Sequence, residues 1–238
     1  MLRFIFVFVF IAILTTFLCP FTVIARPLPK VRDKVCYIIA KIWAKAIIWV
    51  SGVKVSVKGL ENIDKNGPYV FAMNHQSYFD IFSILSILPV KSKWMAKKEL
   101  FYIPFLGWAM KSCDFIPVDR KRAKSAYRAL KRGLELINQG NSIIIFPEGT
   151  RSRDGRIGPF KTGGIILALR SNRPIVPVTI IGTRHIMPKG GRFIRPGHVK
   201  IIIDRPISTK NYKETEKEKL ANILREIIVK NYEMESRF

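Results

Sequence analysis

The pattern of apolar and polar positions divides the chain into an amino-terminal apolar stretch and a longer region of short alternating elements. Residues 4–25 carry no charge over about 22 positions, which is enough for a helix to cross the hydrocarbon core of a bilayer. We predict that this segment spans the membrane or inserts deeply into it. A cleavable signal peptide is the alternative, although its apolar core is usually shorter. Pro20 would kink the helix or end it early, and the helix would then dip into one leaflet.

A second helical pattern follows a break at residues 26–29 and covers residues 35–50. Lys34, Lys41 and Lys45 share one face by their spacing, whereas isoleucine and tryptophan side chains occupy much of the remainder. Cations beside headgroup phosphates and indoles at the boundary are typical of a helix at a membrane interface. The alternative is a core helix packed on the following domain, and the two roles are compatible. We therefore predict a membrane-associated helical hairpin over residues 1–50.

The cations that flank the apolar run lie mainly on its carboxyl side. Arg3 alone precedes the run, whereas Arg26, Lys30, Arg32 and Lys34 follow it. Because cationic flanks stay on the cytoplasmic side of a membrane, we expect the rest of the chain on the cytoplasmic side of the inner membrane.

After Gly52, short apolar runs alternate with helical patterns, which is typical of an α/β domain built around a buried sheet. Candidate strands cover residues 69–73, 93–96, 115–118, 142–146, 175–181 and 199–203. Candidate helices cover residues 77–88, 121–138, 161–170 and 211–232, and the second of these ends near Gly140 as a plausible cap. We predict one mixed-sheet α/β domain flanked by helices over residues 51–238.

The net charge of the chain is strongly positive. Lys and Arg number 41 against 17 for Asp and Glu, which gives a formal net charge of +24. This charge predicts an anionic partner: a phospholipid surface, a phosphate-bearing substrate or nucleic acid. The aromatic residues are not interleaved with the basic runs as base stacking requires, so nucleic acid is disfavoured.

The sequence contains three cysteines, Cys19, Cys36 and Cys113. They lack CxxC spacing and are too few and too scattered for a disulfide framework or a zinc site. We therefore expect a reducing compartment and no metal.

The residues around His75 are the first candidates for chemistry, since the sequence has no GxxxxGK[ST], GxSxG, HExxH or GxGxxG motif. His75 follows a predicted buried strand, where active-site loops of α/β domains lie. If Ser77 caps the next helix, Asp80 lies in its first turn and can reach back to the imidazole. The carboxylate would fix the tautomer and support a general base whose reacting hydroxyl belongs to the substrate. The alternative is a loop histidine capped by an acid for structural reasons.

A second block, FPEGTRS at residues 146–152, follows another predicted strand and opens on the same edge of the sheet. Gly149 permits close approach of the backbone, and Arg151 presents a planar fork of donors that matches phosphate oxygens. Glu148 has three candidate roles: orienting Arg151, binding a glycerol hydroxyl or contacting the dyad. The alternative is a tight turn with a surface arginine.

Two further blocks also belong to predicted strands. Residues 115–120 end in Arg120, and two arginines at neighbouring strand ends, Arg120 and Arg151, would make a phosphate cradle. Residues 175–179 form an apolar strand interrupted by Pro177, for which an edge strand is the alternative.

These four blocks resemble the glycerolipid acyltransferase superfamily, most closely its 1-acyl-sn-glycerol-3-phosphate acyltransferase branch, over about residues 69–178. The NHxxxxD and FPEGTRS motifs, in that order, carry the resemblance. It implies that His75 and Asp80 are the catalytic dyad. It also implies that the phosphate of the acceptor is bound by Arg120, Glu148, Gly149, Thr150 and Arg151.

The resemblance implies acyl transfer from acyl-acyl carrier protein or acyl-coenzyme A to the sn-2 hydroxyl of lysophosphatidic acid, which gives phosphatidic acid. No cofactor is implied, because the thioester already carries the activation. The apolar segment 101–110 would guide the acyl chain, rest in the bilayer or form ordinary core. The alternatives for the function are another lysolipid acceptor, such as lyso-ornithine lipid, and a basic membrane-binding protein without catalysis.

Overall fold

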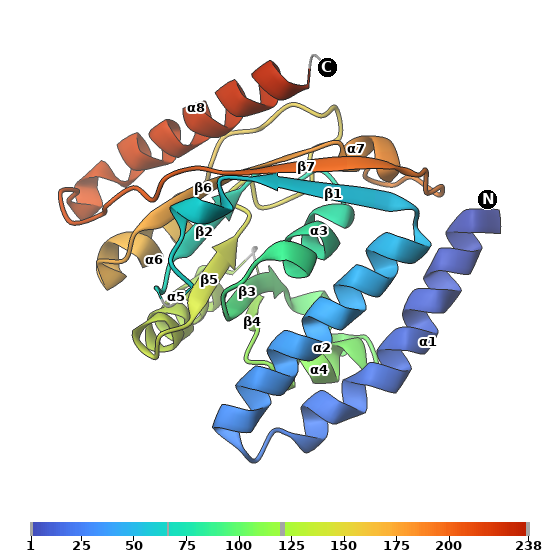
Figure 1. Cartoon of the computed structure of the whole chain (residues 1–238). Helices are drawn as coiled ribbons and strands as arrows, with labels where there is room; N and C mark the ends of the chain where they lie inside the picture. The colour runs from blue at the N-terminus through green and yellow to red at the C-terminus, as the bar shows by residue number, and fades with distance from the viewer. Residues whose placement is uncertain (1, 66, 120–121, 237–238) are drawn as a thin grey trace.

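One sheet of seven strands organises the protein, with helices on both of its faces (Figure 1). The computed structural model describes residues 2–65, 67–119 and 122–236. Within these residues the strands follow the order β1-β7-β6-β2-β5-β3-β4. The strands are β1 (Val53–Lys58), β2 (Val70–Met73), β3 (Ser92–Lys97), β4 (Ile116–Val118), β5 (Ser142–Ile145), β6 (Ile175–Ile181) and β7 (Gly197–Ile203).

The sheet is mixed, as the sequence predicts. Strands β6, β2, β5, β3 and β4 pair in parallel, β7 pairs antiparallel with β6, and β1 pairs parallel with β7. Every residue of β2, β5 and β6 is buried, as expected for parallel strands that are covered on both faces. The carboxyl ends of β2 and β5 therefore meet at one edge, where the loops after them lie side by side.

Two details of the sheet differ from expectation. The sequence pattern does not identify β1, because this edge strand is mostly half-exposed and lacks a continuous apolar run. Strand β6 lies between β2 and β7, so the edge-strand alternative for Pro177 is wrong. The Pro177 carbonyl accepts the N–H of Asp204, which directly follows β7, so Pro177 faces the end of β7. Proline lacks an N–H, and the sheet therefore loses one hydrogen bond at this end, while the rest of the β6–β7 ladder is intact.

Helices cover the two faces of the sheet with separate apolar cores. One core lies under α1 (Leu2–Ile24), α2 (Pro29–Val50) and α3 (Phe79–Ile87). The other lies under α5 (Ala123–Asn138), α6 (Gly163–Ser171) and α8 (Lys217–Glu235). Short helices complete the chain: α4 (Leu106–Ser112), α7 (Thr183–Ile186), and the 3₁₀ helices η1 (Leu60–Asn62), η2 (Lys98–Tyr102) and η3 (Glu214–Glu216).

The amino-terminal helices form the predicted hairpin (Figure 1). Helix α1 continues through Pro20 to Ile24, and within the described residues it is the one helix long and apolar enough to cross a membrane. An Arg3 Nη2 hydrogen bond of 2.8 Å to the carbonyl of Ser51 joins the start of α1 to the end of α2. Helix α2 packs on the following domain, as one of the two alternatives expects, since Ile47 is fully buried; Trp49 of the same helix is 79% exposed.

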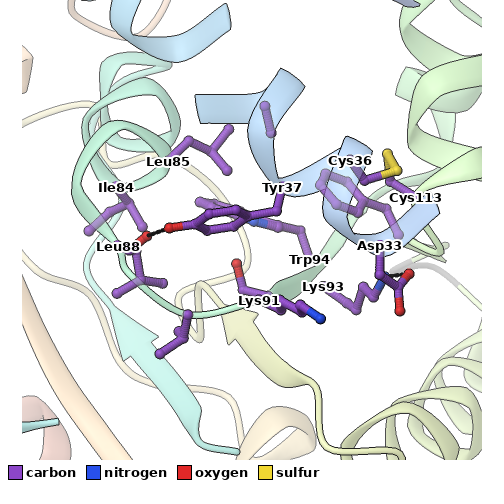
Figure 2. A pocket seen from close by; sticks show the side chains of 14 residues that line it. Asp33, Cys36, Tyr37, Ile84, Leu85, Leu88, Lys91, Lys93, Trp94 and Cys113 are labelled. Carbon is purple, nitrogen blue, oxygen red and sulfur yellow. Dashed lines mark hydrogen bonds and ion pairs between the residues drawn. A yellow bond between two sulfur atoms is a disulfide. The ribbon is translucent and has the colours of Figure 1, made fainter. Parts of the chain in front are cut away.

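Figure 2 shows how α2 is attached to the rest of the protein around a small pocket. Asp33 forms an ion pair of 3.0 Å with the Nζ of Lys93, whose side chain is almost fully buried. The Tyr37 hydroxyl lies 3.5 Å from the carbonyl of Leu88 at the end of α3. These contacts fix the hairpin to α3 and β3, so the hairpin and the sheet form one packed body.

Cys36 of α2 and Cys113, which follows α4, form a disulfide (Figure 2). Their Cα atoms lie 5.6 Å apart although 77 positions separate them in sequence, and this distance lies in the usual range for a disulfide. The expectation that the cysteines form no disulfide is therefore wrong. Helix packing, which the spacing of cysteines does not reveal, brings the two thiols together, and the inference of a reducing compartment loses its basis.

Candidate active site

The carboxyl edge of the β2–β5 pair brings the two main motifs together. The loop after β2 carries His75, and the loop after β5 carries Glu148 and Arg151. The N–H of Ser152 donates to the carbonyl of His75 over 2.8 Å, so the loops are joined through their backbones. The prediction that both motifs open on one edge of the sheet is confirmed.

His75 and Asp80 form the predicted pair. The Nδ1 of His75 lies 2.7 Å from Oδ2 of Asp80, and Asp80 is fully buried whereas the His75 side chain is 12% exposed. Because the carboxylate occupies Nδ1, the second ring nitrogen of His75 is the one left to exchange a proton with a substrate. The imidazole also stacks on Phe146, with 4.0 Å between the ring centroids, which further fixes its plane.

The local helix start differs from the predicted one. Helix α3 begins at Phe79 with Tyr78 at its N-cap, so Ser77 is not the cap. Asp80 itself accepts the N–H groups of Gln76 and Ser77 at 2.7 and 2.8 Å. The carboxylate therefore folds the loop around itself, which is how a residue five positions later reaches the imidazole.

Two further residues of this edge were not singled out from the sequence. The hydroxyl of Thr183, at the start of α7, donates to Oδ1 of Asp80 over 2.5 Å. The side chain of Asn74 pairs with the backbone of Ile180 in both directions, each bond being 2.8 Å long. Asn74 thereby fixes the end of β2 to β6. The only sequence signal for Asn74 was its position beside His75, and Thr183 had none.

Glu148 contacts the dyad, which is one of its three candidate roles. Its Oε1 accepts the N–H of His75 at 2.7 Å, and its Oε2 accepts the N–H of Gly158 at 3.0 Å. Burial raises the pKa of the Glu148 carboxyl above its ordinary value, and the two backbone N–H groups oppose that rise. The side chain thus holds the backbone at His75.

Arg151 lies against an aromatic ring and retains an unused donor. Its Cζ is 3.8 Å from the centroid of Tyr78, a cation–π contact. Its Nη1 is buried and has no hydrogen-bond partner among the described residues. Gly149 has a φ of 76° and allows the loop to turn here. A planar donor that lacks a partner suits an anionic ligand, since leaving it unpaired is costly.

Cations from several segments surround the loop and line one open cavity of about 460 Å³. Lys189 reaches into this group from the segment after α7, and its Nζ donates to the Thr150 hydroxyl and to the Arg151 carbonyl. Desolvation and then the charges of Arg153 and Arg151 lower the pKa of the Lys189 ammonium. We call this space the cationic cavity; its lining includes Glu148, Thr150, Arg151, Arg153, Arg156, Lys161 and Lys189.

A second cavity of about 290 Å³ is almost wholly apolar. Its lining includes Tyr78 and Phe79, just after the loop that carries His75, and Trp94, which contacts the Phe146 ring on which His75 stacks. We call it the apolar cavity; α1, α2, α3, η2 and α4 contribute side chains that include Phe8, Trp43, Leu85, Leu100, Ile103 and Met110. The predicted segment 101–110 therefore supplies part of its wall.

Arg120 lies outside the described residues. The strand before it, β4, is separated from β5 by β3, so the expectation that Arg120 and Arg151 follow neighbouring strands is wrong. The pattern of strands along the sequence does not reveal their order in the sheet. Among residues 2–65, 67–119 and 122–236, no group of three or more His, Cys, Asp or Glu side chains could hold a metal ion.

A model of the acyltransferase family matches residues 54–181. A chloroplastic 1-acyl-sn-glycerol-3-phosphate acyltransferase of Brassica napus is 42% identical over 180 residues, which is 75% of this chain and 52% of that protein. The enzyme of the same name from Limnanthes douglasii is 32% identical over 210 residues, 88% of this chain and 74% of that protein. The chain thus spans between half and three quarters of the length of these two relatives.

The fold is also similar to a solved structure. The crystal structure of the 1-acyl-sn-glycerophosphate (LPA) acyltransferase PlsC from Thermotoga maritima matches with a TM-score of 0.86 and 28% identity. The match covers 98% of this chain and 94% of that one, and so includes the amino-terminal hairpin. The chain therefore belongs to the acyltransferase family, among the relatives of the 1-acyl-sn-glycerol-3-phosphate acyltransferases.

Proposed function

We propose that this protein transfers an acyl chain from a thioester to the sn-2 hydroxyl of lysophosphatidic acid, which gives phosphatidic acid. The observation that carries the proposal is the His75–Asp80 pair, whose immediate neighbours line both cavities. Glu148, which accepts the N–H of His75, lines the cationic cavity, and Tyr78 and Phe79 line the apolar cavity. Lysophosphatidic acid joins a phosphate to an acyl chain, so its recognition calls for both kinds of surface. The names of the relatives support this acceptor.

The dyad acts as a general base and then as a general acid. With Nδ1–H donating to Asp80, Nε2 takes the proton of the sn-2 hydroxyl as the oxygen attacks the thioester carbonyl carbon. When the tetrahedral intermediate collapses, the C–S bond breaks and the proton on Nε2 passes to the departing sulfur. The acyl group moves directly to the acceptor without a covalent acyl-enzyme. The buried carboxylate of Asp80 stabilises the imidazolium that forms between the two steps.

The cationic cavity binds the phosphate of the acceptor. Arg151 and Thr150 line it, Gly149 lets the backbone come close, and we assign Arg120 to the same phosphate from the sequence motif. Both oxygens of Glu148 already accept backbone N–H groups, so its part is to hold the loop at His75. A phosphate held in this way converts a chance encounter into a positioned reaction.

The apolar cavity takes the acyl chain at the reacting end of the dyad. Side chains from α1, α2 and the sheet domain form its wall, and almost all of them are apolar. The donor is acyl-acyl carrier protein or acyl-coenzyme A, in each of which the reacting carbon is a thioester carbonyl. No cofactor takes part, because the thioester bond supplies the driving force.

The hairpin attaches the enzyme to the membrane. Side chains of α1 that face away from α2 are apolar and exposed, among them Phe6, Ile13 and Phe17. Because α1 contacts the rest of the protein near both of its ends, through Arg3 and Cys19, we propose that it lies in one leaflet and does not leave the domain to cross the bilayer. The active site then opens at the membrane surface.

The test is an acyl-transfer assay on the purified protein in detergent. Acyl-coenzyme A and acyl-acyl carrier protein are offered separately, each with lysophosphatidic acid and with a panel of other lysolipids that includes lyso-ornithine lipid. We expect phosphatidic acid to form with at least one donor. Turnover with another lysolipid alone would refute the acceptor and keep the reaction. No turnover with any pair would refute the proposal and favour a membrane-binding protein without catalysis.

A further inference from the structure

The loop between β5 and α6 is held from outside by side chains that donate to its carbonyl oxygens. The carbonyl of Arg151 accepts from Lys189 at 2.6 Å, and that of Gly155 accepts from Gln76 at 2.7 Å. The carbonyls of Ile157 and Gly158 both accept from Arg225, at 2.8 and 3.0 Å. These donors come from three separate segments, and among them Arg225 bonds to two carbonyl oxygens.

Arg225 belongs to α8, the carboxyl-terminal helix, for which the sequence pattern gave no role in chemistry. Helix α8 runs along the outside of the sheet (Figure 1). It reaches the catalytic edge a second time through Tyr232, whose hydroxyl lies 3.2 Å from Oε1 of Gln76. One helix therefore contacts both the loop that carries His75 and the loop that carries Arg151.

A single peptide group connects Arg225 to the catalytic loop. The Ile157 carbonyl accepts from Arg225, and the N–H of the same peptide, at Gly158, donates to Glu148. The other oxygen of Glu148 accepts the N–H of His75. Donation into a carbonyl polarises the peptide and makes its N–H a better donor, so the three bonds strengthen one another.

The charges around Glu148 agree with this geometry. The groups that face its carboxylate are the N–H groups of His75 and Gly158, the Asp80 carboxylate and the Arg225 guanidinium. Asp80 and burial raise the pKa of Glu148, whereas Arg225 and the N–H groups lower it. Arg225 is therefore the one cation named among them that favours the ionised carboxylate, the form in which both oxygens accept.

We propose that Arg225 is a positioning residue for acyl transfer, which holds the Ile157–Gly158 peptide against Glu148 and, through Glu148, the backbone of His75. This inference rests on the proposed function. Anchoring α8 is not its main task, since Leu220, Leu224 and Ile228 of the same helix are fully buried in the core. Loss of the guanidinium should therefore leave α8 in place and loosen the loop.

The test compares three variants of the full-length protein in detergent: Arg225→Gln, Arg225→Lys and the matched control Lys230→Gln, whose side chain is exposed on the same helix. We expect Arg225→Gln to lower kcat/KM about ten- to hundredfold, the range that a displacement of about an ångström produces. The acid limb of its pH profile should move to higher pH, because Glu148 loses the cation that favours its ionised form. Arg225→Lys should recover most of the activity, and Lys230→Gln should behave as the unchanged protein does.

Hydrogen exchange separates this inference from the proposed function. If the unchanged protein makes no phosphatidic acid, the function fails, and the backbone amides of residues 75 and 158 still report on the contact. They should exchange faster in Arg225→Gln than in Lys230→Gln. Unchanged exchange in Arg225→Gln would overturn the inference, as would an unchanged kcat/KM. A loss of activity with no shift of the acid limb and no recovery by lysine would overturn it too, by indicating a merely structural role.

Discussion

Most exposed side chains of α1 are apolar, whereas Asn74, Asp80 and Glu148, polar residues that follow β2 and β5, are buried. Phe17 is 69% exposed, and Asn74 and Asp80 are fully buried. The inner face of the hairpin is bonded to the rest of the protein, whereas the apolar side chains on the outer face of α1 are exposed. At the carboxyl edge of β2 and β5, which carries the candidate site, Asp80 alone accepts four hydrogen bonds from its own chain.

This difference indicates that changes in the two regions should impair different properties of the protein. A change at the catalytic edge alters groups that already have partners, so it should affect turnover and leave attachment to the membrane unchanged. A change on the outer face of α1 should affect attachment and leave the dyad unchanged.

The largest effect should follow from His75→Ala. Removal of the general base should lower kcat by about 10²–10⁴-fold, the usual contribution of a positioned base. The measurement is the initial rate of phosphatidic acid formation at saturating acceptor. His198→Ala, at an exposed position of β7, is the matched control and should keep full activity. Retained turnover in His75→Ala would remove the general-base role, and loss of membrane binding would break the separation of the two regions.

Arg151→Ala should act mainly on binding of the acceptor. Loss of hydrogen bonds from a charged donor to the phosphate costs about 1.5–3 kcal/mol, so KM for lysophosphatidic acid should rise roughly ten- to hundredfold. The KM for the thioester donor should change much less. Arg170→Ala is the control, since Arg170 is exposed and pairs with Glu214 outside the site. If KM for the acceptor stays the same, the phosphate binds elsewhere.

Tyr78 offers a smaller and more specific test. Its ring supports the guanidinium of Arg151, and a cation–π contact is worth about 0.5–2 kcal/mol. Tyr78→Leu should therefore raise KM for the acceptor by a factor of roughly two to thirty. Tyr78→Phe keeps the ring and should stay near the unchanged value. Equal defects in the two variants would point to the hydroxyl and not to the ring.

Sequence reasoning succeeded where a local pattern has one physical meaning. The apolar run predicts α1, the buried strands predict the sheet, and the motif residues His75, Asp80 and Glu148 lie together as expected. For His75 and Glu148, the strand before the residue fixes the edge of the sheet on which it lies, so the local sequence is enough to place it.

The failures concern contacts between segments far apart in sequence. The Cys36–Cys113 disulfide depends on how α2 packs on α4, and the place of β3 between β5 and β4 depends on strand order. Thr183 and Arg225 likewise reach the site from segments without a motif. A pattern in one segment carries no information on which other segment will lie against it.

The smallest effect should be that of salt on membrane binding. The net charge of +24 would allow purely electrostatic docking, which 1 M salt weakens because it shortens the Debye length to about 3 Å. Insertion of the apolar side chains of α1 is not weakened by salt, so washing membranes with 1 M salt should leave the protein bound. Phe17→Glu places a charge on the outer face of α1 that loses its hydration on insertion, and should weaken membrane binding. Met234→Glu, at an exposed position of α8, should stay bound. Release of the unchanged protein by salt would make attachment electrostatic, and the contrast between an apolar anchor and a polar catalytic edge would no longer hold.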